Sequence, residues 1–161
     1  EIYECCLVLV RALLDHGANV HSKIHTTQFS SHGETPLHYA VMGGSSEIVQ
    51  LLCQRGADVD ANDSDGFTPL YFAEHPDVAN VLLENHANPR AVRGENQLME
   101  EKLRSQYVTE ELFRVFFKYG VRFFDDCRES GNRILKFVGW SYGNSELFHV
   151  CLKAVLSVPI V

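Results

Sequence analysis

The chain has 161 residues, with 21 Asp or Glu against 14 Lys or Arg, so its formal net charge is −7. This acidic balance disfavours nucleic acid as a partner, because phosphate binding relies on Lys and Arg. The five cysteines follow no disulfide or zinc spacing, and no secretory signal or membrane-spanning run is visible, which favours a reducing compartment, cytoplasmic or nuclear.

The first predicted element is a helix that includes Leu9–Leu14 and ends at Gly17. The turn that follows, Gly17-Ala18-Asn19-Val20, is repeated later as Gly56-Ala57-Asp58-Val59. Because the later copy is preceded by two helices, we expect the chain to begin inside a repeating unit, at or near the end of a first helix.

A long polar loop comes next, between Val20 and Gly33. The stretch from Gly17 to Gly33 is longer than its later counterpart from Gly56 to Gly66, so this loop carries an insertion. Long loops with a few apolar residues often serve recognition, and Ile24 and Phe29 are candidate anchors. A tolerated insertion is the slightly favoured alternative, since lengthening a surface loop costs little.

The clearest repeat follows this loop: Gly33-Glu34-Thr35-Pro36-Leu37-His38-Tyr39-Ala40 recurs as Gly66-Phe67-Thr68-Pro69-Leu70-Tyr71-Phe72-Ala73. Thr can cap a helix, and Pro fits the first turn, where an N–H would have no partner. Gly43 and Gly44 are predicted to end this helix. A second helix follows from Ser46, with Leu51 and Leu52 in the core, and Gly56 ends it in a left-handed conformation.

A further copy of the second helix and turn covers residues 78–89. Its link to the preceding helix is shorter than in the first copy, and His86 stands where Gly56 stood. A non-glycine residue at this position must accept a positive φ or change the turn.

Past Gly94 the pattern weakens, although its spacing persists. Residues 111–121 and 146–152 predict two more second helices, and 131–138 predict a first helix. A separate helical domain is the alternative for this half. Its aromatic cluster includes Phe113, Phe116 and Phe117 at helical spacing, which favours a core; Phe123, Phe124, Trp140 and Tyr142 lie near turns, where core packing is favoured over a ligand pocket.

The Thr-Pro-Leu-His-x-Ala opening, the helix pair and the Gly-Ala-Asp-Val turn at one period resemble the ankyrin repeat. The resemblance is strong over residues 9–93 and degenerate over 94–157. It implies an all-α solenoid of stacked helix-turn-helix units with short β-hairpin loops. We therefore expect ankyrin repeats in 1–93 and degenerate repeats or a helical extension in 94–161. The resemblance also gives His38 a structural role, with hydrogen bonds within and between repeats.

The same resemblance implies a non-catalytic scaffold or adaptor that binds a protein or peptide and needs no cofactor. Partners of such proteins usually touch the hairpin tips and the exposed face of the first helix. Carried over by position, the candidate partner-binding residues are Ser31, His32, Glu34, Met42, Asn62, Ser64, Asp65, Phe67, His75, Arg90, Val92, Arg93 and Glu95. Phe67 is either an exposed binding anchor or packed on the neighbouring hairpin, and neither is favoured.

Charge is unevenly distributed along the chain. Residues 1–93 hold twelve Asp or Glu and five Lys or Arg, a balance of −7, whereas residues 94–161 hold nine of each. The acidic front half therefore favours a basic partner. Both ends are apolar, which predicts that the chain is a piece of a longer protein, that its ends are covered, or that it self-associates through them.

Catalysis is the alternative class of function. Residues 1–161 would then be the targeting part of a larger enzyme, or a secreted bacterial effector with a divergent catalytic C-terminal half. Cys127, Ser141 and His149 are the candidates, but no family signature surrounds them. No metal site is predicted, because His21, His25 and His32 lack the pairing of zinc motifs.

Overall fold

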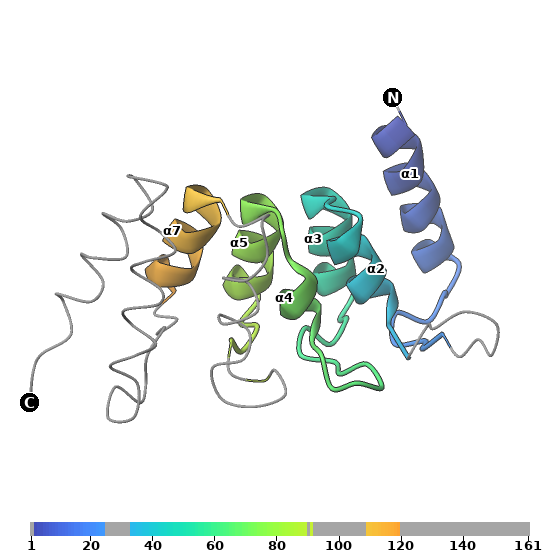
Figure 1. Ribbon diagram of the computed structural model, residues 1–161. Coiled ribbons are helices and arrows are strands. Elements are labelled where there is room, and N and C mark those ends of the chain that lie inside the picture. The colour runs from blue at the N-terminus through green and yellow to red at the C-terminus, as the bar shows by residue number, and fades with distance from the viewer. Residues whose placement is uncertain (1, 25–32, 90, 92–108, 120–161) are drawn as a thin grey trace, which may run out of the picture.

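The computed structural model describes residues 2–24, 33–89, 91 and 109–119, and the account below concerns these residues. The described helices form two layers (Figure 1). One layer contains α1 (Ile2–Asp15), α3 (Ser46–Gln54), α5 (Pro76–Glu84) and α7 (Glu110–Lys118), each packed on the next. The other contains α2 (Pro36–Met42) and α4 (Pro69–Phe72), which pack side by side. This arrangement is the predicted all-α solenoid.

The helix starts follow from the local sequence. Thr35 and Thr68 are the N-cap residues of α2 and α4, and each is followed by a proline in the first turn. Ser45 caps α3, where its side-chain oxygen accepts a hydrogen bond from the Ile48 N–H at 3.3 Å. The Ser45 cap thus satisfies an N–H group that has no partner inside the helix. The ends of the loop after Val20 are joined, because Ile24 N–H donates to the Glu34 carbonyl at 3.1 Å.

The hairpins contain less regular structure than predicted. They are closed by backbone hydrogen bonds such as Asp63 N–H to the Phe67 carbonyl at 3.0 Å, but the described residues contain no β-strand. A few hydrogen bonds close a turn without forming a ladder. The loops therefore project beyond the helices as irregular hairpins, visible along one edge of Figure 1.

Helix α1 differs from the expectation for the start of the chain. Residues 2–15 form one continuous helix, so the segment before Leu9 extends the second helix of the unit and is not the end of a first helix. The physical reason is local, because this segment has no Gly or Pro between Ile2 and Asp15 to interrupt the helix. Its side chains Val8, Leu9 and Leu13 are exposed.

The turns after α1, α3 and α5 use the left-handed conformation. Gly17 and Gly56 have φ values of 86° and 84°, as the sequence predicts for a helix ending on glycine. His86 occupies the equivalent position with φ of 67° and is the non-glycine residue with positive φ in the described part of the chain. The turn geometry is thus retained, and His86 accepts the strained backbone conformation instead of changing the turn.

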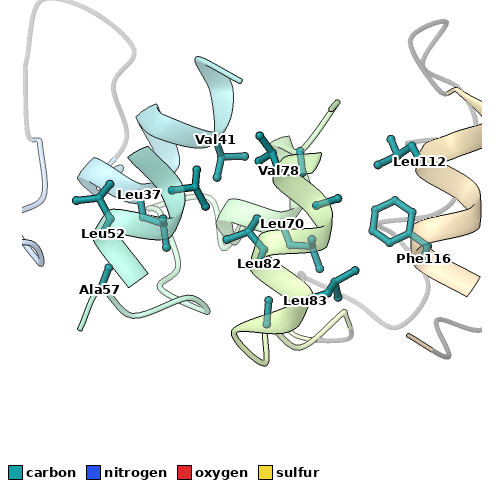
Figure 2. Packing of buried hydrophobic residues seen from close by; sticks show 14 residues of the cluster. Leu37, Val41, Leu52, Ala57, Leu70, Val78, Leu82, Leu83, Leu112 and Phe116 are labelled. Atoms are coloured by element: carbon teal, nitrogen blue, oxygen red, sulfur yellow. The ribbon is translucent and has the colours of Figure 1, made fainter. Parts of the chain in front are cut away.

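One continuous apolar core runs between the layers (Figure 2). Leu51 and Leu52 are buried, as predicted. Leu112 and Phe116 of α7 extend the same core next to α5. The helix predicted at residues 111–121 is therefore present as α7. Most of the remaining predictions for residues 94–161, including the other helices and the turn aromatics, lie outside the described residues, as do the side chains of Phe113 and Phe117.

Polar contacts join neighbouring units at the surface. The Arg55 guanidinium pairs with the Asp15 carboxylate at 2.7 Å and links α3 to α1. The Tyr119 hydroxyl donates to the Asn80 side-chain oxygen at 3.2 Å and links α7 to α5. Exposed contacts of this kind contribute little free energy, so burial of the apolar core supplies most of the stability of the stack.

Candidate functional site

A buried histidine connects the bases of the two hairpins that precede α2 and α4. The Nδ1 atom of His38 accepts a hydrogen bond from the Thr35 backbone N–H at 3.1 Å, and the Thr35 hydroxyl lies 2.9 Å from the same atom. The Nε2 atom lies 3.2 Å from the Phe67 carbonyl oxygen. Because Nδ1 accepts, the ring proton must be on Nε2, which donates to Phe67. His38 therefore has the structural role that the resemblance implies.

The environment of His38 keeps it neutral. Burial is the main cause, and it lowers the pKa of His38 below its ordinary value of 6.5. The Phe67 carbonyl and the nearby carboxylates of Asp63 and Glu34 oppose this shift, while the Lys23 ammonium adds to it. A neutral ring can accept from Thr35 and donate to Phe67 at once, whereas an imidazolium cannot accept.

Asp63 fixes the geometry of the second hairpin. Its side-chain Oδ1 accepts hydrogen bonds from the backbone N–H groups of Asp65 at 2.9 Å and Phe67 at 2.8 Å, and the residue is buried. The Phe67 backbone thus bonds to both Asp63 and His38. Sequence reasoning did not identify Asp63 as this anchor, although an Asp two residues before Asp-Gly is a recognisable turn signal.

The corresponding site one repeat later lacks the histidine. Tyr71 stands at the position of His38, and the Thr68 hydroxyl is fully buried without a hydrogen-bond partner among the residues described. Burying a polar group without a partner is unfavourable. The two threonines therefore occupy the same position in consecutive repeats, but the Thr35 hydroxyl contacts His38 whereas the Thr68 hydroxyl has no partner among the described residues.

This contrast makes a testable prediction for a matched pair of variants. Thr35→Val should lower the free energy of unfolding by about 1 kcal/mol, because it removes a hydroxyl bonded to His38. Thr68→Val should leave it unchanged or raise it by up to about 1 kcal/mol, because it removes an unpaired buried hydroxyl. Urea denaturation followed by circular dichroism measures both. Equal losses in the two variants would contradict the assignment.

An aromatic cluster lies next to this network. The Phe67 ring stacks on Tyr71 with centroids 4.1 Å apart and an interplanar angle of 21°. Phe72 meets Phe67 and Tyr71 edge-on and also contacts the His38 ring, with centroids 5.9 Å apart. All three carbocyclic rings are partly exposed. Phe67 therefore packs on α4 of its own repeat, while it keeps some exposed surface.

Two exposed apolar side chains continue this surface onto α2. Tyr39 is 40% exposed and Met42 is 44% exposed, and their spacing along the helix places them on one face. Tyr39 and Phe72 occupy the same position in consecutive repeats. Tyr39, Phe72 and Tyr71 were not among the candidates from sequence; the helical spacing of Tyr39 to Met42 is the signal that could have found Tyr39.

The remaining candidate partner-binding residues differ in exposure, and some of them lie outside the described residues. Asn62, Ser64 and Asp65 are exposed in the second hairpin, and Asn62 is tied to the preceding loop because the Lys23 ammonium donates to its carbonyl at 2.7 Å. His75 is exposed at the start of α5. Its ring lies so close to Gly44 that a Cβ added at Gly44 would be 2.7 Å from the His75 Cδ2 atom. Glu34 is partly buried. The candidates outside the described residues are Ser31, His32, Arg90, Val92, Arg93 and Glu95.

Most of the candidates for metal binding and catalysis lie outside the described part of the chain. It contains no group of three or more His, Cys, Asp or Glu side chains placed to hold a metal ion. Cys127, Ser141 and His149 lie outside the described residues, as do His25 and His32. No helix within the described ranges is long and apolar enough to cross a membrane.

Comparison with known proteins gives a consistent result. The family model described as ankyrin repeats in three copies matches residues 3–93. An ankyrin repeat-containing protein of Schizosaccharomyces pombe is 32% identical over 78 residues, which cover 48% of this chain and 38% of that protein. Transient receptor potential cation channel subfamily V member 5 of Mus musculus is 47% identical over 70 residues, or 39% of this chain and 10% of the channel.

A third relative is protein phosphatase 1 regulatory subunit 27 of Homo sapiens. It is 32% identical over 97 residues, which cover 58% of this chain and 62% of that subunit. The chain therefore covers less than two thirds of each of these three relatives.

Proposed function

This chain belongs to the ankyrin-repeat family, and we propose that it is a non-catalytic scaffold or adaptor module that binds a protein or peptide partner. Contact would be made by the second hairpin and by the exposed side chains of α2 and α4. Stacked repeats of this kind present an extended surface for macromolecules and carry no built-in chemistry. The proposal extends to a cytoplasmic or nuclear location, which the spacing of the cysteines favours.

The observation that carries this proposal is the row of partly exposed apolar side chains beside a rigid hydrogen-bond network. Tyr39, Met42, Phe67 and Phe72 come from consecutive repeats, and His38 and Asp63 fix the backbone beneath them. Aromatic side chains on a preorganised scaffold are typical of binding hot spots, since they bury large areas with little loss of conformational entropy.

Charge supports a basic partner. Residues 33–89 hold nine Asp or Glu and one basic residue, Arg55, which is already paired with Asp15. A strongly negative surface attracts and orients a positively charged partner, and it repels nucleic acid.

Two of the relatives are named as a phosphatase regulatory subunit and as a cation channel. Each shares only part of its length with this chain. The similarity therefore supports a binding module in this chain and does not assign it to a particular assembly.

The alternative function remains a catalytic one, in which this chain is the targeting part of a larger enzyme or a bacterial effector with a catalytic C-terminal half. Its candidate residues lie outside the described ranges, so no observation favours it over the binding module. Self-association through apolar ends likewise stays a prediction, although α1 exposes Val8, Leu9 and Leu13.

An affinity capture from cell lysate tests the proposal, with bound proteins identified by mass spectrometry. We expect the double variant Met42→Glu, Phe67→Glu to lose the captured partner, because two carboxylates would enter the apolar contact surface. The matched control is Gln50→Glu, Gln54→Glu, which adds the same charge on α3 in the other layer and should keep the partner. Retention by both double variants would place binding elsewhere on the chain.

A further inference from the structure

We propose that two copies of this chain pair through helix α1, in an antiparallel arrangement about a two-fold axis next to Val8. The contact joins the apolar side chains of α1 that lie on the side away from α3. This inference goes beyond the proposed function, because α1 belongs to the other layer from α2 and α4, which carry the proposed partner contacts (Figure 1). Pairing of two copies and capture of a partner can therefore be tested separately.

Helix α1 has two apolar sides. The side that packs on α3 carries partly buried residues, Leu7, Val10 and Leu14. The opposite side carries an exposed stripe, Cys5, Val8, Leu9 and Ala12. Spacings of three and four residues place each set on one side of the helix. The next helix of this layer, α3, packs on a helix at both of its sides, α1 and α5. Helix α1 has the same two-sided character, but its second side is exposed.

The exposed stripe of α1 contains an apolar residue where the other helices of the layer have a charge. Counted back from the left-handed residue after each helix, Val8 has the position of Glu47 in α3 and Asp77 in α5. Both acidic residues are exposed, which suits contact with water. Val8 is 67% exposed and its neighbour Leu9 is 60% exposed. Adjacent exposed apolar side chains of this kind mark a protein contact.

The start of α1 also differs from the start of α3. Before α3, the residues Gly43, Gly44 and Ser45 turn the chain back towards α2. The equivalent residues before Leu7 remain helical, because α1 extends from Ile2. The segment next to Leu7 therefore continues along the helix axis and does not return over the exposed stripe by the turn that joins α2 to α3. A second copy of α1 supplies a helix that is apolar at the matching positions.

The charges beside the exposed stripe select an antiparallel pair. Glu4 and Arg11 are exposed and lie seven residues apart, which is nearly two helical turns, so they share one edge of α1. In an antiparallel pair related by a two-fold axis, equal edges face each other. If the axis lies midway between these residues, next to Val8, Glu4 of each copy meets Arg11 of the other. A parallel pair sets these edges on opposite sides of the contact and forms neither ion pair.

Sedimentation equilibrium of the full chain over a dilution series, with a reducing agent present, tests the pairing. We expect a reversible equilibrium between monomer and dimer. Leu9→Glu should weaken self-association by at least about tenfold, because a carboxylate enters the apolar contact twice in each pair. Met42→Glu places the same charge at an exposed apolar position of α2 and should have no effect. Unfolding midpoints, measured at concentrations where the parent is monomeric, show that each variant remains folded.

Charge exchange tests the antiparallel geometry. Glu4→Arg and Arg11→Glu should each weaken self-association by about threefold to tenfold, because each variant sets like charges against each other twice. An equimolar mixture of the two variants should form a mixed dimer about as tightly as the parent forms its own, since both opposite-charge pairs are then restored.

The results that would overturn this inference are distinct from those that concern the proposed function. A parent chain that is monomeric at every concentration, or a Leu9→Glu variant that associates as tightly as the parent, would overturn the pairing through α1. A mixture of the charge variants that associates no better than either variant alone would overturn the antiparallel arrangement. Leu9→Glu should still capture the lysate partner, so the proposed function stands or falls independently.

Discussion

Replacing Leu52 with Ala is expected to lower the free energy of unfolding by about 2–5 kcal/mol. Leu52 is 2% exposed and belongs to the continuous core between the two layers, where α3 packs on both α2 and α5. The substitution removes buried apolar area and leaves a cavity that the stacked helices can fill only in part. Urea denaturation followed by far-ultraviolet circular dichroism measures the change.

The chain supplies a matched control for this experiment. Leu13 of α1 is 53% exposed, so Leu13→Ala makes the same chemical change and should shift the unfolding free energy by less than about 0.5 kcal/mol. The difference between the two variants isolates burial from helix propensity. Similar losses in both would mean that Leu52 is not part of the core that stabilises the stack.

The second large effect is expected for His38→Ala. This variant should lower the free energy of unfolding by about 2–4 kcal/mol, because the Thr35 N–H loses its buried partner and the Phe67 carbonyl loses one of two. It also removes the edge contact between His38 and Phe72. The lost link joins residues 29 positions apart, so both hairpin bases should loosen together.

The same residue predicts how stability depends on pH. Burial lowers the pKa of His38 in the folded state below 6.5, whereas the unfolded chain has the ordinary value. Below pH 6.5 the unfolded state therefore binds a proton that the folded state resists. This contribution to stability is fully present above pH 6.5 and is lost as the pH falls towards the lowered pKa.

Measurement of unfolding midpoints between about pH 5 and 8 tests this linkage. The parent chain should lose more stability towards acid pH than His38→Ala, and the difference between the two profiles isolates His38 from the other titrating groups. His21→Ala replaces an exposed histidine and should follow the parent profile. Parallel profiles for the parent and His38→Ala would refute a neutral, buried imidazole in the folded state.

The two predictions separate a global role in stability from a local role in binding. Leu52 stabilises the stack as a whole, so its loss should weaken binding only through unfolding. His38 positions the hairpin bases that carry Glu34 and Phe67. Its replacement should therefore weaken binding even at temperatures where the variant remains folded, which a purely global role would not do.

The sequence by itself determined the repeat and its helices. Thr and Pro at a helix start, Gly at a helix end and apolar residues at helical spacing act within one turn, so their positions predicted α2, α3, α5 and α7 without reference to neighbours. The sequence also showed that His86 must either accept a positive φ or change the turn, because this requirement is a property of a single residue, and His86 accepts the positive φ. The continuous helix α1 could have been read from the same local signals.

Only the tertiary structure decided how the candidate surface is built. The hydrogen bond between His38 and the Phe67 carbonyl joins residues 29 positions apart, so it depends on how the two repeats stack. The burial of the Thr68 hydroxyl without a partner among the described residues likewise depends on its packed surroundings. The shielding of the Glu34 Oε2 atom is also a property of the folded chain. Helix signals are short-range, whereas burial and hydrogen-bond pairing between repeats are set by contacts between residues a whole repeat apart, and no local pattern encodes them.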